Sequence, residues 1–397
     1  MKKVLPVFLF IMLLLCADCI AQNRSIVFSE KPLTEILSSA KKEKKLVFMD
    51  AYASWCGPCK WMAANIFTND SAADYYNKTF ICTKVDMEKG EGIILQQKYQ
   101  VRAYPTLLFL DTDGNIVHMK VGAVQSAANL ISLAHTALDP DECYAGYKKR
   151  YSQGENSPEF IYKYLQRISD AYLPVEGPLE RYLSAQKETD FSKPGNWKII
   201  YAYCNDMDSK VFTYMVAHQA EFIHAHGRDS VDKKISDVFM KAIVDLSRSE
   251  IMSDTSYSRL KRKILASGFA GADKVIFDAD LNNCQIQGDA AGFLALAYKG
   301  LDMFYSNDPE MLNNVAWIVH QISKDKKYLG KALLWSKRSV ELKSDASTND
   351  TYAALLYDLG NKEEAVKYCK IALGKARAAG IPSETIEENL KKYETGQ

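Results

Sequence analysis

The amino-acid sequence lacks a dominant charge. Its 397 residues include 50 lysine and arginine residues against 49 aspartate and glutamate residues, and the formal net charge is +1. No basic stripe alternates with aromatic residues, so the pattern typical of a nucleic-acid-binding protein is missing. We therefore expect no nucleic-acid partner. The length and a hydrophobic content of 47% instead predict two or three folded domains.

Long apolar runs are also missing after the first residues of the chain. The one run there, Val4–Leu15, follows Lys2 and Lys3 and is too short to span a bilayer. Its length and basic start are typical of a signal peptide, and Ala21 offers a small residue at the cleavage position. We therefore predict a signal peptide over residues 1–21. The mature protein would be exported and soluble, in the periplasm or cell envelope.

The same segment argues against a lipid anchor. A lipoprotein signal would place a small residue directly before the modified cysteine, whereas Leu15 precedes Cys16 and Asp18 precedes Cys19. A lipoprotein is therefore the less favoured alternative.

Cysteine is too sparse to build a disulfide scaffold. Removal of the predicted signal peptide leaves seven of the nine cysteines, and two of these lie in one short motif. An odd total leaves at least one free thiol when that motif is oxidised. We interpret the others as small buried hydrophobic residues, although a structural disulfide in the C-terminal part stays open. These others are Cys82, Cys143, Cys204, Cys284 and Cys369.

Patterns of metal ligands are missing as well. The cysteine motif has no second CxxC or HxxxH pattern nearby, which a zinc site would need. His224 and His226 form an isolated pair without carboxylate neighbours, which is typical of a surface helix. We expect no metal, and no cofactor other than a redox-active pair of cysteines.

The most informative stretch is Trp55-Cys56-Gly57-Pro58-Cys59-Lys60. Two cysteines separated by two residues can close and reopen a small disulfide. If Cys56 lies where a strand ends and a helix begins, the unpaired N–H groups and the dipole of the helix favour its thiolate, which is the nucleophile. Pro58 suits the first helical turn. Cys59 would then lie one turn further, close enough to resolve a mixed disulfide.

The sequence on both sides agrees with this geometry. Leu46–Met49 is typical of a buried parallel strand, and Met62, Ile66 and Phe67 follow the motif at helical spacing. A CxxC pattern between an apolar strand and a helix is the context of a redox motif. We therefore predict disulfide chemistry for this pair of cysteines.

A second element, Tyr99–Leu107, has the pattern YxVxxxPT. With this element and the WCGPCK motif, the region from Lys45 to Val121 resembles the thioredoxin superfamily. The residues after the motif are similar to exported thioredoxin-like modules, such as the C-terminal domain of the membrane electron-transfer protein DsbD. The resemblance implies an α/β thioredoxin-like domain over residues 22–139, with a central mixed sheet flanked by helices.

The resemblance also implies roles for single residues near the motif. Cys56 would attack a substrate disulfide, and Cys59 would release the product. Asp50 matches a buried acid of the family that accepts the Cys59 proton, and Lys84 matches the lysine that partners this acid. A strand-end cap for Asp50 and an ordinary surface cation for Lys84 stay open as alternatives.

Further residues are assigned to substrate binding by the same resemblance. Pro105 is expected in the cis form, which leaves neighbouring backbone groups free to pair with a substrate strand. Trp55 and Tyr104 would line that groove, next to Gly57 and Pro58 of the motif. Packing alone is the alternative role for the two aromatic residues.

The sequence changes character near Asp139-Pro140. Before that point, strand patterns at 80–86 and 107–118 lie between helical patterns, and the Asp113-Gly114 pair predicts a hairpin turn. Helical patterns dominate from 140 to 397, so we predict that an all-α domain follows the first.

Residues from about 308 onward resemble tetratricopeptide repeats. Asp308-Pro309 is typical of a helix start, and Ala353, Ala365 and Ala372 are small residues where paired helices would approach each other. Between about 141 and 305 no repeat is regular. Such an array stacks its helices and exposes a groove, which would present clients, dock a membrane reductant or mediate self-association.

The combined pattern predicts an exported thiol–disulfide oxidoreductase, an enzyme that reduces or isomerises protein disulfides through its CGPC motif. Its partners would be disulfide-containing client proteins and a membrane electron donor of the DsbD type, because a reductant in an oxidising compartment needs electrons. The Gly57-Pro58 dipeptide is similar to that of thioredoxin, which favours the reducing or isomerising direction. The alternative is a helical-repeat binding or assembly protein that uses the thioredoxin-like module as a scaffold.

Overall fold

The computed structural model describes residues 24–249 and 254–396 of the chain. The predicted signal peptide, with Cys16 and Cys19, lies outside the described residues. The chain divides into two compact units, of which the first ends at Cys204 and the second begins at Asn205. Over the described ranges, no helix combines the length and the hydropathy needed to cross a membrane.

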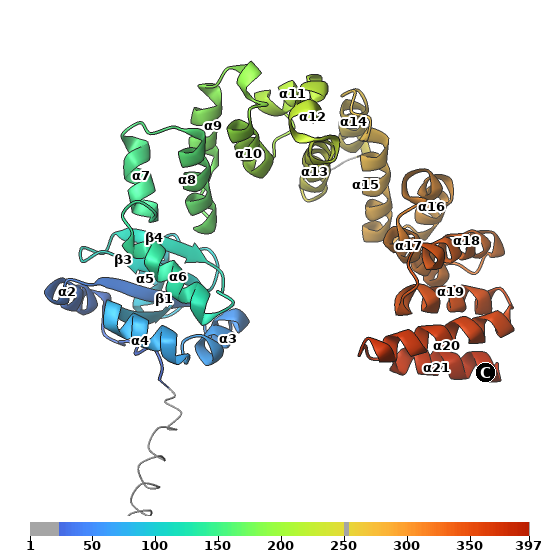
Figure 1. Ribbon diagram of the computed structural model, residues 1–397, viewed down its shortest axis with the longest axis horizontal. Helices are drawn as coiled ribbons and strands as arrows, with labels where there is room; N and C mark the ends of the chain where they lie inside the picture. The colour runs from blue at the N-terminus through green and yellow to red at the C-terminus, as the bar shows by residue number, and fades with distance from the viewer. Residues whose placement is uncertain (1–23, 250–253, 397) are drawn as a thin grey trace, which may run out of the picture. The chain divides into compact units, whose positions relative to one another are not determined.

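The first unit is built on a mixed four-stranded sheet (Figure 1). Its strands are β1 (Leu46–Tyr52), β2 (Phe80–Asp86), β3 (Thr106–Leu110) and β4 (Ile116–Val121). Strand β1 pairs in parallel with β2 and antiparallel with β3, and β3 pairs antiparallel with β4, so the order is β2-β1-β3-β4. The interior residues of β1 are all buried, as expected for a strand covered on both faces.

Helices lie on both faces of this sheet. Those described are α2 (Leu33–Glu43), α3 (Gly57–Asn65), α4 (Asp70–Thr79), α5 (Glu91–Lys98) and α6 (Ala127–Leu138). Helices α3, α4 and α6 form one hydrophobic core with Phe48 of β1, and α2 and α5 form another with Val47 and Met49. Successive strand residues point to opposite faces, so one apolar strand contributes to both cores. The predicted α/β thioredoxin-like architecture is confirmed.

The turn between β3 and β4 follows the predicted hairpin. Gly114 has a φ of 80°, a left-handed backbone that glycine adopts without strain. The Asp111 carboxylate accepts hydrogen bonds from the backbone N–H groups of Asp113 at 2.9 Å and Asn115 at 2.8 Å. These bonds close the turn.

The first unit continues past the sheet into more helices. Those described are α7 (Tyr144–Ser152), α8 (Pro158–Asp170), α9 (Glu176–Ser184) and α10 (Pro194–Tyr203), with the short 3-10 turn η1 (Glu188–Asp190) before α10. Helices α7 and α8 pack against β4. The backbone N–H of Tyr144 donates to Nδ1 of His118 at 3.3 Å, and Lys120 Nζ lies 2.7 Å from Asp170 Oδ1. A domain boundary at residue 139, where α6 has just ended, stays a prediction.

The second unit is helical throughout its described residues. Its helices are α11 (Lys210–Ala217), α12 (Gln219–His226), α13 (Arg228–Ser247), α14 (Asp254–Leu265), α15 (Ala272–Gln287), α16 (Ala290–Tyr305), α17 (Pro309–Ile322), α18 (Lys326–Leu342), α19 (Ala346–Asp358), α20 (Lys362–Ala378) and α21 (Glu384–Thr395). The predicted all-α character of the C-terminal part is confirmed.

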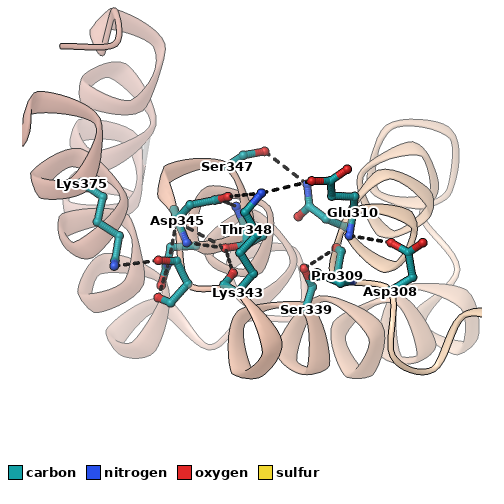
Figure 2. A network of polar contacts seen from close by, with 12 residues as sticks. Asp308, Pro309, Glu310, Ser339, Lys343, Asp345, Ser347, Thr348 and Lys375 are labelled. Atoms are coloured by element: carbon teal, nitrogen blue, oxygen red, sulfur yellow. Dashed lines mark hydrogen bonds and ion pairs between the residues drawn. The ribbon is translucent and has the colours of Figure 1, made fainter. Parts of the chain in front are cut away.

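The last helices pack as consecutive pairs, α17 with α18 and α19 with α20. The small residues Ala353, Ala365 and Ala372 are completely buried, as close approach of helices requires. Polar contacts connect the ends of successive helices (Figure 2). Ser339 Oγ donates to the Pro309 carbonyl oxygen at 2.6 Å, and Lys343 Nζ donates to Glu310 Oε1 at 3.1 Å. The assignment of these pairs to tetratricopeptide repeats stays a prediction.

Candidate functional site

The two cysteines of the CGPC motif form a disulfide at the start of α3. After β1 ends at Tyr52, a hydrogen bond from the Cys56 N–H to the Ala53 carbonyl oxygen, 3.0 Å long, closes the turn. Cys56 caps the helix, because its Sγ accepts a hydrogen bond from the Cys59 N–H at 3.1 Å. Pro58 lies in the first turn, where its missing N–H leaves no helical bond unmade. The predicted strand–motif–helix order is confirmed.

This position favours a negative charge on Cys56 when the disulfide is reduced. The first N–H groups of a helix have no partner within the helix, and the helix dipole adds partial positive charge there. The N–H of Cys59 already points at the sulfur atom that would carry the charge. A thiolate at this position is the nucleophile of disulfide exchange.

The sulfur atoms are nearly covered. Cys56 is 2% exposed and Cys59 is 4% exposed, and Tyr52 and Tyr104 pack against this pair. Trp55 is by contrast 66% exposed, although it directly precedes Cys56. The Trp55 indole is therefore largely exposed beside two nearly covered cysteines.

Two aromatic side chains at the site, Trp55 and Tyr104, form hydrogen bonds with residues of the segment that follows β2. The rings of Trp55 and Tyr104 meet edge-on, with centroids 5.9 Å apart. Trp55 Nε1 donates to Glu88 Oε2 at 2.9 Å, and Gln96 Nε2 of α5 donates to the Tyr104 hydroxyl at 2.8 Å. Sequence reasoning missed Glu88 and Gln96, since no local pattern marks a residue whose partner lies in a different element.

Asp50 is a buried acid on β1, where it is only 5% exposed. Burial raises its pKa to about 7, against the opposing influence of the Lys84 charge. Its Oδ1 is buried without a hydrogen-bond partner among the described residues. Burial without a hydrogen-bond partner at Oδ1 therefore keeps this carboxyl group protonated above the usual pH range of an aspartate.

Lys84 stands opposite Asp50 in the register of β1 and β2. Its side chain is exposed, and its Nζ lies 6.0 Å from the centroid of the Phe28 ring. The strand pairing thus brings together the two residues that the resemblance pairs. The charge of Lys84 reaches Asp50 and lowers its pKa, although less than burial raises it.

The peptide bond between Tyr104 and Pro105 is cis, as predicted. The Pro105 carbonyl oxygen accepts a hydrogen bond from the Gly122 N–H at 2.8 Å, and Thr106 Oγ1 donates to the Ala103 carbonyl oxygen at 2.7 Å. The loop before β3 is therefore fixed beside the end of β4.

Gly57 stands in open space. A Cβ atom at this position would meet no atom within 4 Å, and its φ is not in the left-handed region. The fold of the described chain therefore does not require glycine here.

Five further cysteines lie in the part of the chain that the structure describes. No disulfide joins them, and all are buried except Cys284, which is half-buried. They fit the interpretation as small hydrophobic residues. Within the described ranges, no group of three or more metal-ligating side chains is close enough to hold an ion, and His224 and His226 lie at the end of α12.

Comparison with known proteins covers the same part of the chain. The family described as Thioredoxin matches residues 27–135. Thioredoxin-T of Drosophila melanogaster is 33% identical over 113 residues, which are 28% of this chain and 68% of that protein. Thioredoxin H5 of Arabidopsis thaliana is 33% identical over 121 residues, which are 30% of this chain and 92% of that protein.

One solved structure is similar over the same region. It is a candidate disulphide-isomerase from Bacteroides thetaiotaomicron, 42% identical, with a TM-score of 0.28, covering 30% of this chain and 98% of that one. The sheet order, the cysteine pair at the start of α3 and the cis peptide before Pro105 all lie within the matched residues 27–135. The chain belongs to the thioredoxin family, and this part of it is a thiol–disulfide oxidoreductase domain.

Proposed function

We propose that this protein is an exported enzyme that reduces or isomerises disulfides of client proteins. The observation that carries the proposal is the Cys56–Cys59 pair at the start of α3, where the Cys59 N–H already donates to Cys56 Sγ. A helix start stabilises the thiolate that the reaction needs.

The reaction consists of two exchanges. In the first, the Cys56 thiolate attacks one sulfur of a client disulfide, which forms a mixed disulfide and releases one client thiolate. In the second, the Cys59 thiolate attacks Cys56 Sγ, which releases the second client thiolate and closes the Cys56–Cys59 disulfide. The client gains two electrons, and the enzyme is left in the oxidised form, which an external dithiol must reduce.

Asp50 would accept the proton that Cys59 loses in the second exchange. Its burial and its pKa of about 7 support this role, because a base of that pKa is partly ionised at neutral pH. Lys84 would tune this base, since its charge favours the carboxylate.

The client segment would bind across the mouth of the site. Trp55 and Tyr104 would contact it, the open space at Gly57 and Pro58 would admit its backbone, and backbone groups beside Pro105 would pair with it. The exposure of Trp55 and its hydrogen bond to Glu88 support this arrangement, since they hold an apolar ring out toward the client.

Two parts of the proposal, export of the protein and its electron donor, are supported by the sequence alone. The basic and apolar start of the chain supports a signal peptide and a location in the periplasm or cell envelope. A membrane electron donor of the DsbD type would return the pair to its dithiol form. The Gly57-Pro58 dipeptide supports the reducing or isomerising direction.

Catalysed reduction of insulin by dithiothreitol tests the proposal directly. We expect the purified protein to accelerate it, and a Cys59→Ala variant to accumulate a mixed disulfide with its client. A reduction potential near that of a strong oxidant, about −120 mV, would contradict the reducing direction.

One observation favours a second candidate function. The Thioredoxin match ends at residue 135, whereas helices continue to Thr395, so most of the chain lies outside the redox domain. A helical binding or assembly protein would use that domain as a scaffold. A cellular phenotype of the gene deletion that a Cys56→Ser protein still complements would favour this scaffold function.

A further inference from the structure

The turn between α8 and α9 reaches the redox end of the sheet (Figure 1). Asp170, the last residue of α8, pairs with Lys120 of β4 at 2.7 Å. Two residues after Lys120, the Gly122 N–H donates to the Pro105 carbonyl oxygen at 2.8 Å. A short chain of contacts therefore joins this turn to the loop that lies beside the disulfide.

The turn is anchored by apolar residues on both sides of Tyr172. Ala171 is 3% exposed and belongs to the core cluster that contains Met119 of β4, and Leu173 packs against the same cluster. Tyr104, the aromatic neighbour of Trp55, packs against this cluster too. The turn therefore has a fixed position against the redox domain and is not a loose connection between helices.

Between these anchors, Tyr172 is held outward at an energetic cost. Its φ is 54°, a left-handed backbone that disfavours a residue with a bulky side chain. Backbone hydrogen bonds from Tyr172 to Ser169 and from Leu173 to Ile168, each 3.0 Å long, keep this conformation. The side chain is nevertheless 57% exposed, and no hydrogen bond or ring contact holds it among the described residues.

These two backbone hydrogen bonds close the C-terminal end of α8, and a glycine in place of Tyr172 would form them without the cost of a left-handed side chain. The helix end therefore does not call for a tyrosine, whose side chain is mostly exposed. Strain in a non-glycine residue that persists without a packing gain points to a function of the side chain. An exposed tyrosine offers a large amphipathic contact area with little loss of side-chain entropy on binding, which is why binding surfaces use it.

We propose that Tyr172 contacts the polypeptide client of the redox site and makes the enzyme prefer polypeptide disulfides over small ones. The occupant is the extended client segment next to the attacked cysteine, which lies across the Pro105 loop and continues toward the α8–α9 turn. The inference rests on the proposed function, because it assigns a specificity-determining residue to the same site. It also gives the first helices after the sheet a direct part in substrate selection.

Two disulfide substrates separate this role from a structural one. The first is a peptide of about twenty residues with one internal disulfide, and the second is the small aromatic disulfide 5,5′-dithiobis(2-nitrobenzoate). For Tyr172→Asn, which keeps a residue that tolerates left-handed backbone, we expect kcat/KM for the peptide to fall about threefold to tenfold. We expect kcat/KM for the small disulfide to stay unchanged, and Tyr172→Phe to retain most of the activity toward the peptide.

Tyr201→Ala is the matched control, because Tyr201 is an exposed tyrosine of α10 in the same unit whose ring packs on Trp197. We expect this variant to leave both rates unchanged. Equal rates of Tyr172→Asn and the unaltered protein on both substrates would overturn the proposal, and so would a parallel loss on both. An unaltered protein that reduces neither disulfide would overturn the proposed function as well, so the two failures are distinguishable.

Discussion

Helices α3 and α7 begin in the same way, yet only one of them carries the redox site. At each start a cysteine caps the helix, and its sulfur accepts a backbone hydrogen bond from the residue three positions later. The distance is 3.1 Å from the Cys59 N–H to Cys56 Sγ and 3.3 Å from the Gly146 N–H to Cys143 Sγ. The same capping geometry of a cysteine sulfur is therefore present twice.

The difference lies in the residue that donates the hydrogen bond. In α3 this residue is a second cysteine, which closes the disulfide. In α7 it is Gly146, and a Cβ atom there would lie 1.7 Å from the Pro140 carbonyl oxygen, so any side chain at this position would force the backbone to shift. A helix start alone therefore does not make a redox site, since exchange also needs a resolving thiol within reach.

The largest expected effect separates the two capping cysteines. Cys56→Ser should lower the rate of insulin reduction by at least about 10³-fold, because it removes the nucleophile. Cys143→Ser should leave the rate within about twofold, because a serine hydroxyl also caps a helix. A loss of activity in Cys143→Ser, with unchanged circular dichroism, would contradict the contrast between the two helix starts.

The second prediction concerns Asp50, on the strand that leads to α3. Its pKa is raised from 3.8 to about 7, so between these pH values the folded protein holds a proton that the unfolded chain releases. The free energy of unfolding should therefore fall as the pH rises through this range, by up to about 4 kcal/mol from this group. Relative to the unaltered protein, Asp50→Asn should therefore gain stability as the pH rises, which urea unfolding of both oxidised proteins from pH 4 to pH 8 would measure.

The same titration contains its own control. With the disulfide closed, Cys56 and Cys59 do not titrate, so the change between Asp50→Asn and the unaltered protein reports on the carboxyl group. If the two proteins show the same pH dependence, Asp50 is not the proton-exchanging group that the proposed mechanism needs.

The third prediction concerns His118, which accepts the hydrogen bond from the Tyr144 N–H at the start of α7. Burial, assisted by the charges of Arg167 and Lys120, lowers its pKa from 6.5 to about 4, against the opposing charge of Asp170. Between these pH values the unfolded chain binds a proton that the folded protein does not. Stability from this group should therefore be complete above about pH 6.5 and be lost as the pH falls, by up to about 3 kcal/mol.

Between about pH 4 and pH 6.5, Asp50 and His118 should thus change the free energy of unfolding in opposite directions, so each variant is compared with the unaltered protein at the same pH. His118→Gln keeps a hydrogen-bond acceptor but cannot titrate in this range, so its stability relative to the unaltered protein should decline as the pH rises from 4.5 to 6.5. Urea unfolding of both proteins at these two pH values would show this. A stability difference that is the same at both pH values would place the titrating group elsewhere.

The smallest expected effect compares the two glycines. Gly146→Ala should destabilise the protein by about 2 kcal/mol, because the added methyl group meets the Pro140 carbonyl oxygen. Gly57→Ala should change the stability by less than about 0.5 kcal/mol, since no atom lies within 4 Å of the added group. Thermal unfolding of both variants measures the difference, and equal melting temperatures would contradict it.

Much of the redox domain could be predicted from the sequence. The strand Leu46–Tyr52, the motif and the helix after it are local patterns, as are the hairpin turn at Gly114 and the helical character after residue 140. Helix α4 went unpredicted, although Asn69 caps it with hydrogen bonds to the N–H groups of Ser71 and Ala72. Its short polar sequence offers little periodicity to read.

The residues that contact the aromatic side chains of the site could not be predicted from local sequence patterns. Glu88 and Gln96 act on Trp55 and Tyr104 across the gap between two elements, and nothing in their own neighbourhood marks them. The same is true of Tyr172, whose neighbours join it to the sheet only after α8 has packed on β4.

The sequence by itself determined the chemistry of this protein, because two cysteines and a proline at fixed spacing act through the few residues around them. Only the tertiary structure decided which side chains surround the cysteine pair, that the first unit extends to Cys204, and that Cys143 forms no disulfide. The physical reason is the separation along the chain of the groups that interact. Helix starts and turns depend on backbone groups a few residues apart, whereas burial, proton affinity and substrate contact depend on segments that packing alone brings together.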